Sequence, residues 1–222
     1  MKKNILVVIG VVALALALDQ CLKVWVKTHM YYGQDIPILG LSWAKLSFVE
    51  NFGMAFGWAL GVAWGKLALS LFRMVAIGFL ISYIRKLIIR GASPSFLVCL
   101  SLILAGAVGN MIDSSVYGLV FSASDPVQAA LAVAFPHGGG YAGFLHGKVV
   151  DMLHFTARYP NWFPRLHGQE IFPYVFNISD SCITCGVTCI LLFHQRMFSA
   201  SPSKKEVDHE SLPPEDTNIV SV

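Results

Sequence analysis

The sequence predicts an α-helical membrane protein with four transmembrane helices, a small extracytoplasmic β-sheet between helices 1 and 2, and a long extracytoplasmic insert between helices 3 and 4. Hydrophobic residues make up 55% of the 222 residues and charged residues only 13%. The mean hydropathy is +0.63. Soluble domains carry about 25% charged residues, so this composition excludes an ordinary soluble domain. Four apolar stretches also approach the roughly 20 residues that a helix needs to cross a bilayer.

The four predicted spans contain few charges, and they cover residues 5–26, 67–89, 95–112 and 178–198. The first span follows Lys2 and Lys3, a pattern that is also typical of a secretory signal peptide. Its apolar run continues past Asp19, however, and no clean cleavage site precedes a mature domain. We therefore interpret this segment as a transmembrane helix.

The distribution of basic residues predicts the orientation in the membrane. They are densest before the first span, between the second and third, and after the fourth: Lys2, Lys3, Arg85, Lys86, Arg90, Arg196, Lys204 and Lys205. Short segments rich in Lys and Arg face the cytoplasm, so both termini are expected there. As many basic residues fall on the other side, but they are spread over long segments, where the rule is weak. Arg73 is expected near the outer rim of the second helix, with its side chain extended outward to water.

The two outer segments differ in their patterns. Residues 27–66 mix aromatic and aliphatic residues in short alternating runs, which favours strands such as residues 43–50. The insert covers residues 114–174, and its alanine-rich residues 127–135 are expected to form a short interfacial helix.

The remaining chain divides into two parts. Residues 199–222 are polar, contain three prolines and carry mixed charge, which predicts a disordered cytoplasmic tail. Residues 1–198 then form one integral-membrane domain. The net charge of +3 is small and no basic-aromatic stripe is present, so nucleic acid is not expected as a partner.

Two aspartates, Asp151 and Asp180, lie in or beside apolar segments. Asp151 follows two valines, and Asp180 stands at the start of the last span. Charged side chains at membrane depth or at its rim are costly and usually functional. Two carboxylates that lie close together share one proton, which is how an aspartyl protease activates water. We therefore predict an aspartyl peptidase that needs no metal and no other cofactor.

Further polar residues are expected at the same membrane depth. Asn110 and Asp113 lie three apart at the outer end of the third span, as do Asn177 and Asp180 at the start of the fourth. A spacing of three places each pair on one helix face. Asn51 lies at the outer end of the strand region. The convergence of these side chains indicates a polar site at the outer membrane surface.

Structural roles compete with the functional ones. Asn177 is suited to cap the last helix, and Asp180 is suited to interact favourably with its dipole. Asp19 and Lys23 lie four apart and are expected mainly to form an ion pair along the first helix. The polar group as a whole nevertheless exceeds what capping requires.

Other chemistries have less support in the sequence. Cys182, Cys185 and Cys189 share one helix face, but cysteine more often serves as a small residue at a helix contact, so no metal site is predicted. Residues 136–140 resemble an oxyanion loop, yet the sequence has no Gly-x-Ser-x-Gly or His-Glu-x-x-His motif. A small polytopic ion or proton transporter is the alternative, because intramembrane Asp and Lys also mark ion paths. The lack of an internal repeat disfavours it.

Several short blocks of the sequence match one known family. They are Asp-Gln-Cys-Leu-Lys at 19–23, Val-Glu-Asn-Phe-Gly-Met-Ala-Phe at 49–56, Gly-Ala-Val-Gly-Asn-Met-Ile-Asp at 106–113, Val-Val-Asp-Met-Leu at 149–153, and Phe-Pro-Tyr-Val-Phe-Asn-Ile-Ser-Asp at 172–180. In the order and internal spacing of these blocks, residues 19–198 resemble the lipoprotein signal peptidases (signal peptidase II), which are bacterial membrane aspartyl proteases.

The resemblance implies that Asp151 and Asp180 are the catalytic dyad and that Asp19 and Lys23 are supporting residues. It also implies a substrate-binding polar shell, which consists of Asn51, Gly53, Asn110, Asp113 and Asn177. The implied substrate is a diacylglyceryl-modified prolipoprotein that is cut before its lipidated cysteine, and membrane lipid is the other implied partner. We expect a monomer in the bacterial inner membrane, with the active site near the outer leaflet.

Two features depart from the family pattern. The family usually has arginine directly after the aspartate of the third block, but this chain has Ser114. Any role of that arginine is lost or supplied from elsewhere, with Arg158 and Arg165 of the insert as the candidates. The insert is also longer than in compact members of the family, and we expect it to reshape the lid over the active site.

Overall fold

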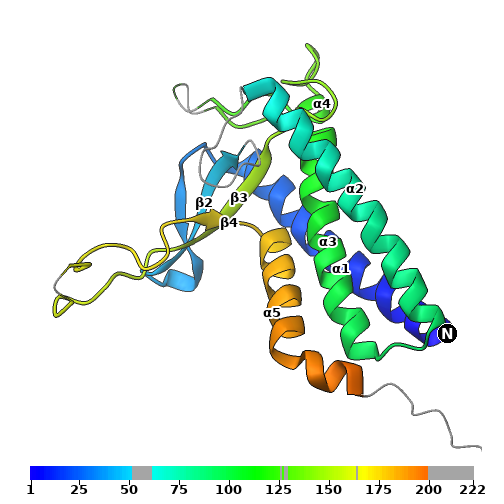
Figure 1. The fold of residues 1–222 in the computed structure, drawn as a ribbon. Coiled ribbons are helices and arrows are strands. Elements are labelled where there is room, and N and C mark those ends of the chain that lie inside the picture. The colour runs from blue at the N-terminus through cyan, green and yellow to red at the C-terminus, as the bar shows by residue number, and fades with distance from the viewer. Residues whose placement is uncertain (52–61, 126, 128–129, 164, 200–222) are drawn as a thin grey trace, which may run out of the picture.

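Four long helices and one small sheet make up the computed structural model, which describes residues 1–51, 62–125, 127, 130–163 and 165–199 (Figure 1). The helices are α1 (Lys2–His29), α2 (Val62–Ile89), α3 (Pro94–Ile112) and α5 (Ile178–Ser199). Within the described residues, three helical segments are long and apolar enough to cross a membrane, namely Lys2–His29, Gly65–Ile89 and Pro94–Val120. A shorter apolar segment, Ile178–Phe193, forms most of α5. Each predicted span therefore coincides with an apolar helix.

The helices expose apolar side chains over much of their surface. On α2, Phe72, Val75 and Phe79 are 70%, 73% and 72% exposed. Soluble proteins rarely expose large contiguous apolar patches, whereas side chains that face lipid are expected to be apolar. The outward faces of the helices therefore fit a bilayer.

A tight link joins α2 to α3. Gly91, two residues past the end of α2, has a φ of 73°, a left-handed conformation that glycine adopts without strain. Ser93 then caps α3 by accepting the Phe96 N–H at 3.4 Å, and Pro94 occupies the first helical position. Figure 1 places this link at the same end of the molecule as the N-terminus and the described end of α5.

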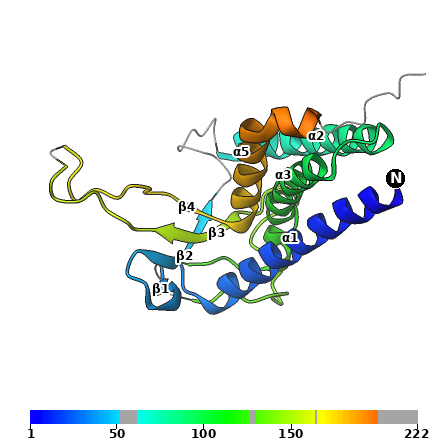
Figure 2. The same cartoon turned by 90° about the horizontal axis from the view of Figure 1, so that it is seen from below.

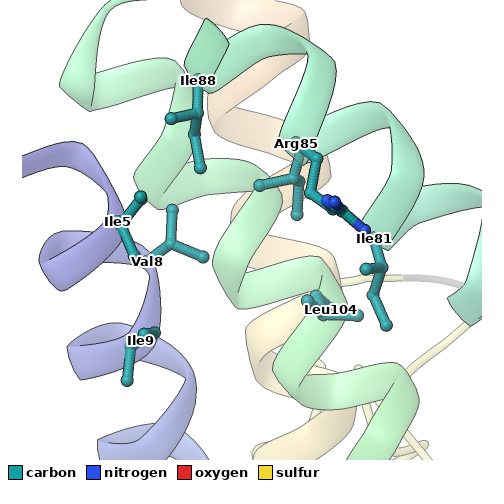
Figure 3. A pocket seen from close by; sticks show the side chains of 8 residues that line it. Ile5, Val8, Ile9, Ile81, Arg85, Ile88 and Leu104 are labelled. Carbon is teal, nitrogen blue, oxygen red and sulfur yellow. The ribbon is translucent and has the colours of Figure 1, made fainter. Parts of the chain in front are cut away.

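An apolar groove lies between α1 and α2, near this link (Figure 3). Its volume is about 310 Å³, and its walls include Ile5 and Val8 of α1 and Ile88 of α2. Arg85 is the charged member of its lining. The basic end of α2 therefore borders an apolar groove, while Arg85 itself is exposed.

The sheet is antiparallel and four-stranded, with the strand order β1-β2-β3-β4. Its strands are β1 (Asp35–Pro37), β2 (Ala44–Asn51), β3 (Val149–Phe155) and β4 (Val175–Phe176). The strand predicted at residues 43–50 is confirmed as β2, shifted by one residue. The sheet is not confined to the segment between α1 and α2, however, because β3 and β4 belong to the insert. Pairing of β2 with β3 places Val49 opposite Asp151. The alternation of apolar and polar residues within one strand does not reveal which distant strand it pairs with.

A hydrophobic core attaches the sheet to the end of α1. Val26 of α1 and Met30, the residue that follows α1, pack with Phe48 of β2 and with Val150 and Met152 of β3, and all five are fully buried. Successive side chains of a strand point to opposite faces of the sheet. The side chain between Val150 and Met152 therefore points away from this core.

The described residues of the alanine-rich stretch 127–135, namely 127 and 130–135, are not helical, so the predicted interfacial helix is wrong there. Where they are described, they pair antiparallel with the segment that follows α3, through the bridges Phe121–Ala134 and Asp125–Ala130. Nine residues are too few for a helix to be stable without packing. Pairing with residues 121–125 satisfies backbone groups of this stretch instead.

Candidate active site

Asp151 lies on β3 and is 4% exposed. Its Oδ1 accepts a hydrogen bond from Asn177 Nδ2 at 2.7 Å, and its Oδ2 accepts one from Asn51 Nδ2 at 3.3 Å. Burial and the negative charge of Asp180 raise the pKa of Asp151 to about 7, although the two amide hydrogen bonds act in the opposite direction. A carboxyl group with this pKa gains and loses its proton near neutral pH, as acid-base catalysis requires.

Asp180 lies in the first turn of α5, where a capping box positions it. Asn177 Oδ1 accepts the backbone N–H of Asp180 at 2.9 Å, and Asp180 Oδ2 accepts the backbone N–H of Asn177 at 3.3 Å. This reciprocal pair joins the N-cap and the third helical residue. The roles predicted for Asn177 as a cap and for Asp180 as a charge at the helix start are thus confirmed. Asp180 is only partly buried, so water can reach it.

Two asparagines connect the carboxylates. Asn110 Nδ2 donates to Asp180 Oδ1 at 2.8 Å, while Asn177 Nδ2 contacts Asn110 Oδ1 at 3.2 Å in addition to Asp151. Asn177 is fully buried and Asn110 is 5% exposed. Both aspartates are therefore held by amide donors on helix ends, and they lie close enough for their charges to interact.

A buried ion cluster adjoins the two asparagines. Lys23 Nζ lies 2.9 Å from Asp19 Oδ2 and 2.8 Å from Asp113 Oδ2, and the three side chains are at most 2% exposed. Lys23 Nζ also donates to Asn110 Oδ1 at 3.0 Å. The predicted pairing of Asp19 with Lys23 along α1 is confirmed, and Asp113 adds a second carboxylate from the end of α3.

The same cluster ties the helices to the sheet. Asp19 Oδ1 accepts the N–H of Ser179 in α5 at 2.8 Å, and Asp113 Oδ2 accepts the N–H of Val150 in β3 at 3.3 Å. Close packing of α3 permits these contacts, because a Cβ at Gly109 would lie 2.1 Å from Ser179 Oγ. Gly109 therefore lets α3 approach α5 at the depth of the site.

Beginning at Asp113, the chain forms a π-helical turn, η3 (Asp113–Tyr117), and then the short helix α4 (Gly118–Val120). Ser114 Oγ and Ser115 Oγ donate to carbonyl oxygens one turn earlier, at 3.0 and 2.8 Å. Such hydrogen bonds compete with the regular helical pattern, and π-helical turns are frequent at functional sites.

Sequence reasoning missed several polar residues near the site. Gln20 Nε2 donates to the carboxylates on both sides of Lys23, at 3.0 Å each, and Tyr117 donates to Gln20 Oε1 at 3.1 Å. Lys27 forms a buried ion pair with Glu50 of β2. The i, i+4 spacing from Lys23 places Lys27 on the same helix face, so this spacing was a usable signal. Gln20 offered none beyond its place in the first block.

The structure corrects two predictions about arginine. Arg73 does not extend outward, because it is partly buried and its Nη1 donates to Ser114 Oγ at 3.5 Å. Arg158 is 65% exposed and lies 3.9 Å from Glu170, and Arg165 is exposed as well. Both belong to an arm of the insert that projects from β3 and β4 (Figure 2). Arg73, rather than either arginine of the insert, therefore reaches Ser114.

Apart from Gly53, which lies outside the described residues, the predicted site residues converge on one end of the helices. Among the residues that the structure describes, no group of three or more His, Cys, Asp or Glu side chains is placed to hold a metal ion. Two interacting carboxylates with amide donors around them can share a proton, remove a proton from water and donate a hydrogen bond to a carbonyl oxygen.

Comparison with known proteins gives one consistent picture. The family model for Signal peptidase (SPase) II matches residues 11–196. The lipoprotein signal peptidase of Porphyromonas gingivalis is 46% identical over 199 residues, which cover 87% of this chain and 84% of that protein. The enzyme of the same name from Amoebophilus asiaticus is 36% identical over 200 residues and covers 86% of this chain and 79% of its own length.

Solved structures share the fold. A bacterial membrane enzyme solved at 1.9 Å resolution by the in meso method has a TM-score of 0.51 and 26% identity, and the match covers 86% of this chain and 92% of that one. A second bacterial membrane enzyme, solved at 2.3 Å, has a TM-score of 0.53 and 23% identity, with 94% and 96% of the two chains covered. At this identity, the second match indicates the fold alone.

Proposed function

Because this chain belongs to the signal peptidase II family, multi-pass membrane aspartic peptidases that remove signal peptides from prolipoproteins, we propose that Asp151 and Asp180 are its catalytic dyad. The observation that carries this assignment is the position of Asn177, whose side chain binds Asp151 while its backbone N–H binds Asp180. One residue thus fixes both carboxylates relative to each other.

In the proposed mechanism, the dyad shares one proton. Asp151 is the better holder of that proton, because burial and the charge of Asp180 raise its pKa to about 7. Asp180 is placed to act as the base, because it is only partly buried and so open to water, while Asn110 Nδ2 and the backbone N–H of Asn177 hold its carboxylate in place. Ionised Asp180 accepts a proton from water as the water attacks, while protonated Asp151 donates a hydrogen bond to the scissile carbonyl oxygen. The asparagines Asn51, Asn110 and Asn177 hold the dyad or the substrate backbone.

We further propose that all four helices cross the membrane, with both termini in the cytoplasm. The N-terminus, the basic link between α2 and α3, and the described end of α5 lie together, opposite the sheet (Figure 1). Short basic segments favour the cytoplasmic side. The sheet, the insert and the dyad then lie at the outer leaflet, residues 1–198 form one domain, and residues 199–222 form a cytoplasmic tail.

The proposed substrate is a diacylglyceryl-modified prolipoprotein, cut on the amino side of its lipidated cysteine by a monomeric enzyme. An apolar groove of about 510 Å³ on α1 supports a lipidated substrate, since it reaches Ile178, two residues before Asp180. Its remaining lining is apolar apart from one thiol and consists of Ala17, Leu18, Cys21, Leu22 and Trp25. Acyl chains in this groove would lie beside the dyad.

The test is cleavage of a lipid-modified prolipoprotein by purified protein in detergent with EDTA. Asp151→Asn and Asp180→Asn should each abolish cleavage, because neither variant can share a proton between two carboxylates. Asp35→Asn is the matched control, since Asp35 lies on β1 at the exposed edge of the sheet and pairs with Lys45. Near-normal turnover by either dyad variant, with the control also active, would exclude this assignment.

A further inference from the structure

The first half of α2 carries three polar residues on one face. Lys66, Ser70 and Arg73 follow one another at intervals of four and three residues, which places them on a single helix face. Lys66 is 3% exposed, Ser70 is 1% exposed, and Arg73 is partly buried. Charged residues within a membrane helix usually face the protein interior and mark functional positions. This polar face of α2 therefore turns toward the rest of the protein rather than toward lipid.

Arg73 connects this face to the dyad through two intermediate residues. Its Nη1 donates to Ser114 Oγ at 3.5 Å, and Ser114 Oγ donates to the main-chain carbonyl oxygen of Asn110 at 3.0 Å. Asn110 Nδ2 then donates to Asp180 Oδ1 at 2.8 Å. The Arg73 guanidinium also interacts favourably with the charges of Asp180, Asp113 and Asp151, most strongly with that of Asp180. Geometry and electrostatics thus link Arg73 to the same carboxylates.

The charge balance of the site gives this contact its importance. Four carboxylates gather here, those of Asp19, Asp113, Asp151 and Asp180. Among the described residues, Lys23 neutralises only part of this charge, because it is shared between two of them. The other cations near the site face Glu50: Lys27 and Lys148 pair with it, and Lys66 is attracted by its charge.

We propose that Arg73 is a positioning residue whose positive charge keeps the Asp151–Asp180 pair singly ionised and whose contact with Ser114 joins α2 to the turn of α3 that carries Asn110. The inference rests on the proposed dyad. An opposite charge favours the ionised form of a carboxyl group. Arg73 therefore counteracts the two effects that favour protonation of the pair, which are the burial of Asp151 and the repulsion between the two aspartates. Arg73 of α2 thereby supplies the positive charge that is missing at position 114, where this chain has serine.

The experiment compares the pH dependence of kcat and KM for three variants in detergent. Arg73→Gln keeps a hydrogen-bond donor near Ser114 but removes the charge. Arg73→Lys keeps the charge but changes the donor geometry. Arg85→Gln is the matched control, because Arg85 lies on the same helix twelve residues away, about 18 Å along the axis, in the groove shown in Figure 3.

We expect the whole pH-rate profile of Arg73→Gln to move upward by about one pH unit, because loss of an opposite charge makes each proton of the pair harder to remove. On the acidic limb this corresponds to a roughly tenfold loss of kcat with little change in KM. The pH midpoints of Arg73→Lys should lie close to those of the wild type, and those of Arg85→Gln should equal them. A purely structural role would lower the height of the profile without displacing its limbs.

The inference would be overturned if the pH-rate profile of Arg73→Gln had the same midpoints as the wild type. It would also be overturned if the profile of Arg73→Gln were displaced but that of Arg73→Lys were displaced just as far. If Arg73→Gln does not fold, Arg73→Lys with a displaced profile would also contradict it, since the charge is retained. Failure of the proposed dyad is a different result, because it is seen as activity of Asp151→Asn or Asp180→Asn.

Discussion

Lys23→Met isolates the energetic role of the buried ion cluster. The substitution removes the cation from between Asp19 and Asp113, which lie 2.9 and 2.8 Å from Lys23 Nζ and are almost fully shielded from solvent. Removing one partner of a buried ion pair costs about 3–5 kcal/mol, because it leaves an uncompensated charge. For a protein of 150–250 residues, each kcal/mol lowers Tm by roughly 2–4 °C. We therefore expect the Tm of Lys23→Met to fall by about 6–20 °C.

The assay is thermal unfolding in detergent, followed by intrinsic fluorescence, with cleavage measured in parallel. Lys45→Met is the control, because Lys45 and Asp35 form a pair at 3.2 Å whose side chains are 31% and 45% exposed. Such a pair contributes about 0–1 kcal/mol. Replacing both carboxylates by Asn in the Lys23→Met background should recover part of the loss, since no unpaired charge then remains. If Lys23→Met were no less stable than Lys45→Met, the cluster would not stabilise the fold as argued.

Two further predictions concern the dyad and its cap. Because the pKa of Asp151 is raised to about 7, the shared proton is present below that pH, and kcat should fall as the pH rises through about 7; a kcat that stays level from neutral to alkaline pH would contradict the assignment of the proton. Asn177→Ser retains an oxygen to cap α5 but loses the amide donor to Asp151, whereas Asn177→Ala loses both. Both should lower kcat by roughly 100-fold, and the alanine variant should be about 1 kcal/mol less stable than the serine variant; equal stability of the two, measured by thermal unfolding, would show that the cap contributes little.

The features that sequence alone predicted are local ones. Hydropathy over about 20 residues locates a membrane helix without knowledge of its neighbours, and the helix period alone pairs Asp19 with Lys23. The Asn177–Asp180 spacing likewise contains the capping box, since both partners lie within one turn. These features follow from the covalent spacing of residues in a regular helix, and they were the reliable part of the prediction.

The features that the sequence did not yield depend on contacts between distant segments. Pairing of β2 with β3 turns Asp151 toward α5 rather than toward the core, and no local pattern specifies that partner. The inward turn of Arg73 depends in the same way on the position of Ser114, on another helix. Residues 127–135 show the converse failure, because a good local helix pattern gave way to backbone pairing with residues 121–125.

The capping of α5 and the arrangement of the proposed dyad depend on the same two residues, Asn177 and Asp180. A capping box needs an oxygen at the N-cap and a carboxylate three residues later, and both satisfy backbone N–H groups that a helix start leaves without partners. The same geometry fixes the Asp180 carboxylate in the field of α5 and leaves the Asn177 amide free to reach Asp151 across the gap to β3. The sheet contributes the second carboxylate where burial raises its pKa. A helix start and a buried strand therefore place two chemically identical side chains in unlike environments, which is the condition for one to act as base while the other holds the proton.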